Sequence, residues 1–199
     1  MRRRDLLLTP LAGAVVFAKP AWEPLVSGNE LKGWRQEGRA LWSLADGVII
    51  GRQGPGGAAG ELLTEKQWAD FELELEWRMT WPGNSGIWFR YANAKAAYQA
   101  DILDQASHPG VLSGSLYCMG KAFIAENRDA ASVHKDGWNK LRIEAHGDQI
   151  TIEQNGRRVI RIDDATFPGP GSVGIQLHAG KAFEGMEVRV RGMRIRSLR

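Results

Sequence analysis

The chain has 199 residues, of which 43% are apolar and 25% charged, a composition typical of one soluble globular domain with a sizeable core. The formal net charge is only +3, and no basic stripe follows the chain, which argues against a nucleic-acid-binding protein. Cys118 is the single cysteine, so an intrachain disulfide is excluded. Eight tryptophans exceed what such a core needs, and we expect some of them to face a ligand.

Residues 1–18 have the features of a secretory signal peptide. Arginines open the segment, an apolar run covers 6–17, and Ala18 ends a small-residue cleavage pattern. Residues 3–7 also fit the twin-arginine export pattern, with an ordinary Sec signal or an uncleaved anchor as the alternatives. Three arginines and one aspartate give this segment a net charge of +2, which leaves the mature chain +1 of the total +3. We expect export to the periplasm or exterior of a bacterium, with no transmembrane segment in the mature form.

From residue 41 onward the sequence reads as short strands separated by turns. Residues 41–51 predict two strands around the turn at Asp46–Gly47, and residues 71–79 alternate strictly between apolar and polar side chains. Further strands are predicted over 83–91, 98–104, 114–119, 139–162, 171–180 and 186–198. Short helical turns are predicted near 27–31 and 65–68.

About ten to twelve strands at this spacing indicate an all-β protein, a two-sheet antiparallel jelly-roll sandwich. No repeat or linker divides the chain, so residues 19–199 are predicted to form a single domain. Many strands carry one polar face. We therefore expect one curved sheet whose concave side is open to a ligand.

Several segments, in order, resemble the 3-keto-disaccharide hydrolase domain family, formerly a domain of unknown function. DFELELEWRMTWPGNSGIWFR is similar to the family's DFEL…EFR…GNSGIFFR, YQADILD to its YEVQILD, and GSLY to its GALY. VGIQLHAG followed by VRVRGMRIRSL resembles the family's GLQLHGG…FRNIRIREL. The resemblance runs from Trp22 to Leu198 and rests on the order and spacing of the motifs. It implies a concanavalin A-like fold and an activity on glycosides oxidised to a ketone at sugar carbon 3.

The chain departs from the family pattern in the strand YQADILD. Gln99 stands where the family motif has glutamate, and Asp101 stands where it has glutamine. The carboxylate has therefore moved two positions along one strand face, which is about 7 Å. Either the site tolerates this shift, or the chemistry differs or is lost.

Candidate site residues lie on the polar faces of the predicted central strands. His178 and Gln176 share one face of the strand over 171–180, and Gln99 and Asp101 share one face of the strand over 98–104. Histidine can act as a base, a metal ligand or a hydrogen-bond donor to the substrate. The alternative for each pair is an exposed polar surface.

The strand over 83–91 offers Asn84, Trp88 and Arg90 on one face. Arginine can hold an oxyanion or a sugar hydroxyl, and tryptophan can stack on a sugar ring. The alternative places Trp88 in the core and Arg90 at the surface. Tyr117, the last residue of GSLY, and Lys121, which follows this segment, are candidate donors to the ligand.

A stripe of glutamates over 71–79 is typical of a solvated face. Glu76 lies nearest the following turn and is the member placed to reach a site. The sequence has no HExxH, CxxC or EF-hand spacing. A divalent metal ion held by His178, Asp101 and Glu76 across strands is a further hypothesis.

The resemblance implies an exported enzyme that cleaves 3-keto-glycosides. A ketone at carbon 3 makes the hydrogen on carbon 2 acidic, so that a base can remove it, the group on carbon 1 can leave by elimination, and water can then add. This chemistry needs one base, one acid and stabilisation of the enolate oxygen. The hypothesis assigns His178 as base or metal ligand, Asp101 as acid, base or ligand, Arg90 to the developing charge, Gln99, Gln176 and Asn84 to hydroxyl groups, and Trp88 to stacking.

The alternative hypothesis is a carbohydrate-binding, lectin-like module without catalysis, and Gln99 in place of glutamate favours it. A structural domain of the cell envelope is a third. The expected ligand is a small carbohydrate. A 3-keto substrate would require a sugar 3-oxidoreductase as a pathway partner.

Overall fold

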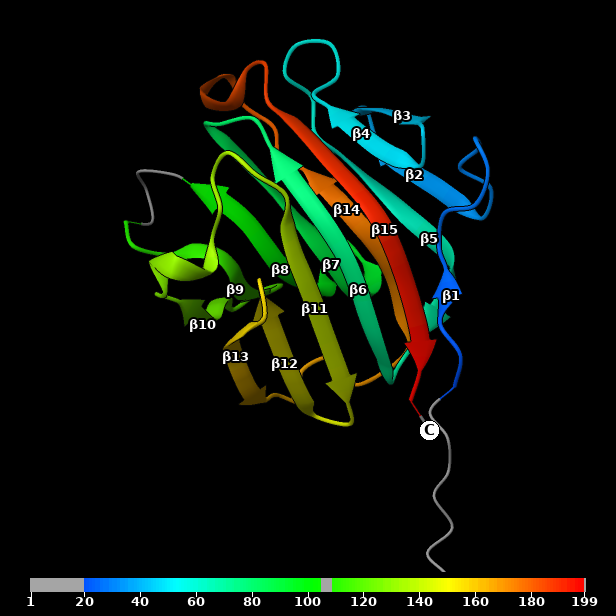
Figure 1. Ribbon diagram of the computed structural model, residues 1–199, viewed down its shortest axis with the longest axis vertical. Coiled ribbons are helices and arrows are strands. Elements are labelled where there is room, and N and C mark those ends of the chain that lie inside the picture. The colour runs from blue at the N-terminus through cyan, green and yellow to red at the C-terminus, as the bar shows by residue number, and fades with distance from the viewer. Residues whose placement is uncertain (1–19, 105–108, 199) are drawn as a thin grey trace, which may run out of the picture.

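The computed structural model describes residues 20–104 and 109–198, and the predicted signal peptide at 1–18 lies outside them. Two antiparallel sheets pack face to face (Figure 1). One sheet has the order β13-β12-β11-β6-β15-β4-β3, with β1 paired to β15, and the other has the order β10-β9-β8-β7-β14-β5-β2. The prediction of an all-β two-sheet sandwich is confirmed.

The first sheet contains β1 (Glu23–Pro24), β3 (Leu41–Ala45), β4 (Val48–Arg52), β6 (Phe71–Met79), β11 (Asn139–His146), β12 (Gln149–Gln154), β13 (Arg157–Asp163) and β15 (Glu187–Ser197). The second contains β2 (Trp34–Gly38), β5 (Gly60–Trp68), β7 (Gly83–Asn93), β8 (Ala96–Asp104), β9 (Leu112–Cys118), β10 (Ala122–Asn127) and β14 (Gly171–Leu177). Two short 3₁₀ helices, η1 (Ala130–Ser132) and η2 (Lys181–Phe183), complete the described elements.

The helical turn predicted near residues 65–68 is wrong, because these residues are the end of β5. β5 pairs with β14 on one side and with β2 on the other. Over residues 65–68, pairing with β14 and the hydrogen bond from the Glu65 N–H to the Gly33 carbonyl outweigh the weak local preference for helix. Across the described residues, no helix has the length and apolar character needed to cross a membrane.

The core forms because each central strand turns every second side chain inward. In β8, Tyr98, Ala100 and Ile102 are fully buried in the core between the sheets. Fully burying a side chain of the size of isoleucine contributes about 1.5–3 kcal/mol, so this face is strongly fixed. Gln99 and Asp101 must then point to the opposite, outer face of the seven-stranded sheet.

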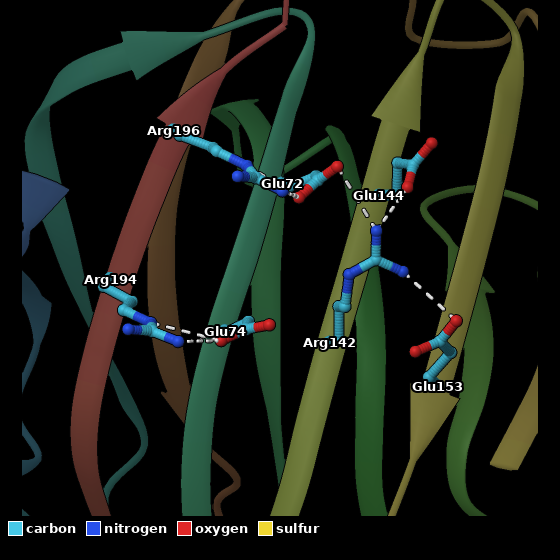
Figure 2. A network of polar contacts seen from close by, with 7 residues as sticks. All are labelled: Glu72, Glu74, Arg142, Glu144, Glu153, Arg194 and Arg196. Atoms are coloured by element: carbon cyan, nitrogen blue, oxygen red, sulfur yellow. Dashed lines mark hydrogen bonds and ion pairs between the residues drawn. The ribbon is translucent and has the colours of Figure 1, made fainter. Parts of the chain in front are cut away.

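The outer face of the eight-stranded sheet carries a ladder of ion pairs whose members range from partly exposed Glu76 to buried Glu72. The glutamates of β6 face arginines of β15 and β11 (Figure 2). Arg194 donates to Glu74 at 2.6 Å, and Arg191 donates to Glu76 at 2.7 Å. These contacts lie across strands, so they link the middle of the sheet rather than its edges.

Glu72 is the member of this ladder that is completely buried. Arg196 Nε lies 2.7 Å from its carboxylate, and an Arg142 nitrogen lies 3.3 Å away. Arg142 also contacts Glu144 and Glu153, so one arginine joins carboxylates from three strands (Figure 2). A carboxylate that is shielded from solvent needs such partners, because burying an isolated charge is strongly unfavourable.

We predict that Glu72→Gln destabilises the fold by about 2–3 kcal/mol. The substitution leaves two arginines facing each other without the anion, and their partial exposure keeps the loss below the full value for a buried pair. Urea unfolding measures the change. Glu126→Gln, which removes an exposed partner of Arg128, is the control and should change stability by less than about 0.5 kcal/mol. Equal effects of the two substitutions would contradict the prediction.

Candidate functional site

A cavity of about 340 Å³ opens on the outer face of the seven-stranded sheet. Its walls come from β7, β8, β9, the start of β10, and the end of β14 with the residue that follows it. The lining residues are Asn84, Trp88, Gln99, Asp101, Tyr117, Met119, Ala122, Phe123, Gln176 and His178. The structure therefore brings together most of the side chains singled out from the sequence.

Strand register explains why these side chains meet. Asp101 of β8 lies opposite Gly86 of β7, and Gly86 lies opposite Gln176 of β14. In the next row, Gln99 lies opposite both Trp88 of β7 and Tyr117 of β9. Directly opposed residues on neighbouring strands lie about 5 Å apart, so the two rows bring these side chains onto one surface.

Gly86 leaves space for the Gln99 side chain. A β-carbon on Gly86 would lie 2.5–2.7 Å from three atoms of the Gln99 side chain. Glycine at this position therefore lets the Gln99 amide lie over the neighbouring strand beside Asp101. The sequence GNSG contains this signal, since the second glycine falls on the polar face of a strand.

Three polar atoms of lining residues are buried without a hydrogen-bond partner in the described part of the chain. They are Gln99 Nε2, Trp88 Nε1 and Gln176 Oε1. Buried polar groups in proteins are nearly always paired, so each exception calls for an explanation. Two donors and one acceptor around one cavity fit a ligand that is rich in hydroxyl and carbonyl groups.

Asp101 is the only carboxylate among the described residues that line the cavity. It is 5% exposed, and no hydrogen bond or ion pair to it is found among the described residues. Burial raises the pKa of the Asp101 carboxyl well above its usual range. A carboxyl in this environment retains its proton at higher pH and can act as a general acid.

His178 follows the last residue of β14 and is exposed at the rim of the cavity. Its backbone N–H donates to the Asn84 carbonyl at 3.2 Å, and its ring packs edge-on to Phe183 at 5.5 Å. Nδ1 lies 2.6 Å from the Ala179 carbonyl. A carbonyl only accepts, so in the neutral ring Nδ1 carries the proton and Nε2 carries the lone pair. The ring is thus held in the tautomer that a base at Nε2 requires.

Arg90 does not reach the cavity, and its predicted place near a developing charge is wrong. Its backbone has φ 48°, within a bulge in the pairing of β7 and β8, which breaks the alternation of side chains. The guanidinium is buried and donates to the carbonyls of Ala69 and Gly147 at 2.8 Å each, and to Asp70 at 3.2 Å. Arg90 instead ties together the turns at one end of the sandwich.

Glu76 and Lys121 also lie elsewhere. Glu76 is on the outer face of the other sheet and pairs with Arg191. Lys121 is exposed and directed to Thr166, with Nζ–Oγ1 2.6 Å, and to Asp164. Neither residue lines the cavity.

The metal site suggested from His178, Asp101 and Glu76 is not assembled, because Glu76 belongs to the opposite sheet. Among the described residues, no group of three or more histidine, cysteine, aspartate and glutamate side chains could hold a metal ion. We therefore derive no step through a metal.

The cavity also has a wall that the sequence interpretation missed. Met119, Ala122 and Phe123 belong to the β9–β10 hairpin, and Phe123 packs edge-on to Tyr117 at 5.7 Å. The glycine at position 120 indicates the turn of this hairpin. Which of its side chains line the cavity depends on the register of β9 against β8, which the local sequence does not show.

Comparison with known proteins identifies the family. The model of the 3-keto-alpha-glucoside-1,2-lyase-like domain matches residues 21–196. The chain belongs to this family. A 3-keto-disaccharide hydrolase of Bacteroides thetaiotaomicron is 26% identical over an alignment 163 positions long, and the match covers 68% of this chain and 56% of the relative. The chain thus spans little more than half the length of that relative.

Solved structures share the fold of this family member at lower identity. A candidate glycosyl hydrolase from Parabacteroides distasonis has a TM-score of 0.69 and 21% identity, covering 90% of this chain and 100% of its own. The carbohydrate binding module CBM66 from Bacillus subtilis has a TM-score of 0.66 and 21% identity, covering 83% and 96%. A Bacillus subtilis protein with a galectin-like fold has a TM-score of 0.67 and 14% identity, covering 91% and 96%. The expected concanavalin A-like, lectin-type sandwich is confirmed.

We predict that Arg90→Lys destabilises this family member by about 3 kcal/mol, because lysine cannot reproduce the fork that contacts several acceptors at once. Sugar binding by the fraction that remains folded should be unchanged. Urea unfolding and titration of tryptophan fluorescence with a sugar, both at low temperature, measure the two effects. Arg128→Lys at the surface is the control. If the variant kept normal stability and lost sugar binding, Arg90 would have to act in the site, and the prediction would be wrong.

Proposed function

We propose that the protein cleaves the glycosidic bond of 3-keto-glycosides, including 3-keto-disaccharides, by elimination followed by hydration. One observation carries the proposal: the cavity combines a single buried carboxyl, Asp101, with a histidine whose Nε2 is free to act as a base. Membership of the 3-keto-alpha-glucoside-1,2-lyase-like family supports the substrate class.

In the proposed first step, His178 Nε2 removes the proton on sugar carbon 2. The electrons of this bond form the enolate, whose charge rests on the oxygen at carbon 3. Gln99 Nε2 and Trp88 Nε1 are unpartnered donors that can stabilise this oxygen, the role once expected of Arg90. Preorganised donors of this kind are among the largest contributions to catalysis.

In the proposed second step, the ketone re-forms, a double bond forms between carbons 1 and 2, and the bond from carbon 1 to the leaving oxygen breaks. Asp101 gives its proton to that oxygen, which suits a carboxyl that burial keeps protonated. Water then adds at carbon 1 with the ionised Asp101 as base, and the histidine returns its proton to carbon 2. The products are the free 3-keto sugar and the released alcohol.

The register leaves room for a sugar between the two groups. Asp101 and His178 are two strands and about two residues apart, which places their α-carbons about 12 Å from each other. Both side chains line the same cavity, so acid and base can act on one ring from two sides.

Carbohydrate binding without turnover is the second candidate. Gln99 in place of the family's glutamate favours it, since the carboxylate expected at that position is absent. The catalytic and the binding hypotheses use the same unpartnered polar atoms, so only a measurement of substrate turnover distinguishes them.

We also propose that the protein is exported, on the sequence of residues 1–18, and that a sugar 3-oxidoreductase supplies its substrate. A keto group at carbon 3 has to be introduced by oxidation before the proposed elimination can begin.

Residues 19–199 should release glucose from 3-keto-trehalose, in which the leaving group is glucose, and not from unoxidised trehalose. Asp101→Asn and His178→Ala should each lower kcat by at least about a hundredfold. Released glucose is followed over time with and without EDTA, which tests metal dependence. Tyr117→Phe, which changes another lining residue by one oxygen, is the comparison. Saturable sugar binding with no release from either sugar would support the binding module instead.

Asp101→Asn should also make the fold more stable at neutral pH. Burial raises the pKa of Asp101 in the folded state above its unfolded value of about 4. Between these two pKa values the carboxyl is ionised in the unfolded state and still protonated in the folded state. The stability of the wild type therefore falls through this window as pH rises, and asparagine removes that loss. Urea unfolding at about pH 4 and about pH 7.5 should show a gain for the variant only at the higher pH. A variant that is equally stable or less stable at the higher pH would contradict the burial of the carboxyl.

A further inference from the structure

The polar row that contains Asp101 continues beyond the cavity. Gln176 lies opposite Glu61 of β5, and Glu61 lies opposite Glu37 of β2. The complete row across the outer face therefore runs Asp101, Gly86, Gln176, Glu61, Glu37. From Asp101 to Glu61 it crosses three strand spacings, which is about 14 Å.

Within this extension, Glu37 and Glu61 differ in one respect. Glu37 is already held, by an ion pair with Arg35 and by the hydroxyl of Tyr91, which donates to it at 2.8 Å. Glu61 is half-buried, and among the described residues it has no hydrogen bond or ion pair. Burial, with Glu37 nearby, raises its pKa. Glu61 is thus a hydrogen-bonding group without a partner.

A nearly buried, unpartnered side chain joins the cavity to this extension. Trp88 is 6% exposed, its indole N–H has no partner, and it lines the cavity. The same ring packs against Tyr91 at 5.7 Å and belongs to a small apolar cluster with Leu63 of β5. Gly174 of β14 lies opposite Trp88 and has no side chain, and Leu63 of β5 occupies the space above it, so that Leu63 and Trp88 meet across β14. The buried oxygen of Gln176, also unpartnered, lies on the same boundary.

We infer that Glu61, with Gln176 and Trp88, forms a second sugar subsite that binds hydroxyl groups of the leaving-group sugar. This inference rests on the proposed function, because it places the 3-keto ring in the cavity beside Asp101. A disaccharide extends over two rings, and the row from Asp101 to Glu61 has the corresponding length. The unpartnered carboxylate accepts hydroxyl hydrogens, and the small part of the Trp88 ring that lines the cavity contacts the sugar between the two ends.

The test compares two substrates of the same 3-keto sugar, one with a methyl leaving group and one with a second sugar. Glu61→Ala should raise KM for the 3-keto-disaccharide about tenfold and leave kcat/KM for the methyl 3-keto-glucoside within about twofold. Glu65→Ala, an exposed glutamate on the same strand, is the matched control and should change neither. Glu61→Gln, which keeps an accepting oxygen, should recover part of the loss. An equal loss with both substrates, or no loss with either, would overturn the subsite.

A binding experiment keeps the subsite testable if the wild type cleaves neither keto sugar, which would refute the proposed function alone. Tryptophan fluorescence is titrated with an unoxidised disaccharide and with the corresponding methyl glucoside. The wild type should bind the disaccharide more tightly, and Glu61→Ala should bring the two affinities together. Equal affinities in the wild type, or an unchanged preference in Glu61→Ala, would overturn the inference.

Discussion

The site depends on the alternation of side chains in β8 and in the parts of β7 and β14 that line the cavity, which is fixed by the burial of their inner faces. Tyr98, Ala100 and Ile102 occupy the core, so Gln99 and Asp101 have no other direction than outward. A slip of one residue would bury the polar face and expose the apolar one, at a cost of several side chains at about 1.5–3 kcal/mol each. The free energy of the apolar core therefore keeps the Asp101 carboxyl buried, although burial is unfavourable for the ionised form of that carboxyl.

The same alternation decides how far the sequence could predict the site. A period of two shows which residues share a face, and this was sufficient for Asn84, Trp88, Gln99, Asp101, Gln176 and His178. The prediction fails where the period of two is interrupted. At the bulge in β7, Arg90 has φ 48° and its side chain points to the buried end of the sandwich. A bulge of this kind is set by pairing with neighbouring strands and leaves little trace in the local sequence.

Alternation also cannot show to which sheet a strand belongs. Glu76 lies on a correct polar face of a correctly predicted strand, but that strand is the centre of the opposite sheet. Glu61 was missed for the related reason that no strand was predicted over 60–68, where only a helical turn near 65–68 was expected, while pairing with β2 and β14 makes this segment an interior strand. Both errors concern long-range pairing, which depends on contacts between residues far apart in the chain.

The number of carboxylates in the cavity bears directly on the chemistry. Ordinary glycoside hydrolysis uses two carboxyl groups about 5–10 Å apart that flank one bond. Glu37 and Glu61 are directly opposed on neighbouring strands, but neither lines the cavity, and Glu37 is occupied by Arg35 and Tyr91. Beside Asp101 the cavity offers neutral donors and a histidine, which cannot replace a second carboxylate in stabilising an oxocarbenium ion. The histidine can remove a proton, and the neutral donors can stabilise an enolate oxygen. The cavity therefore suits the proposed substrate, whose own ketone supplies the acidity at carbon 2.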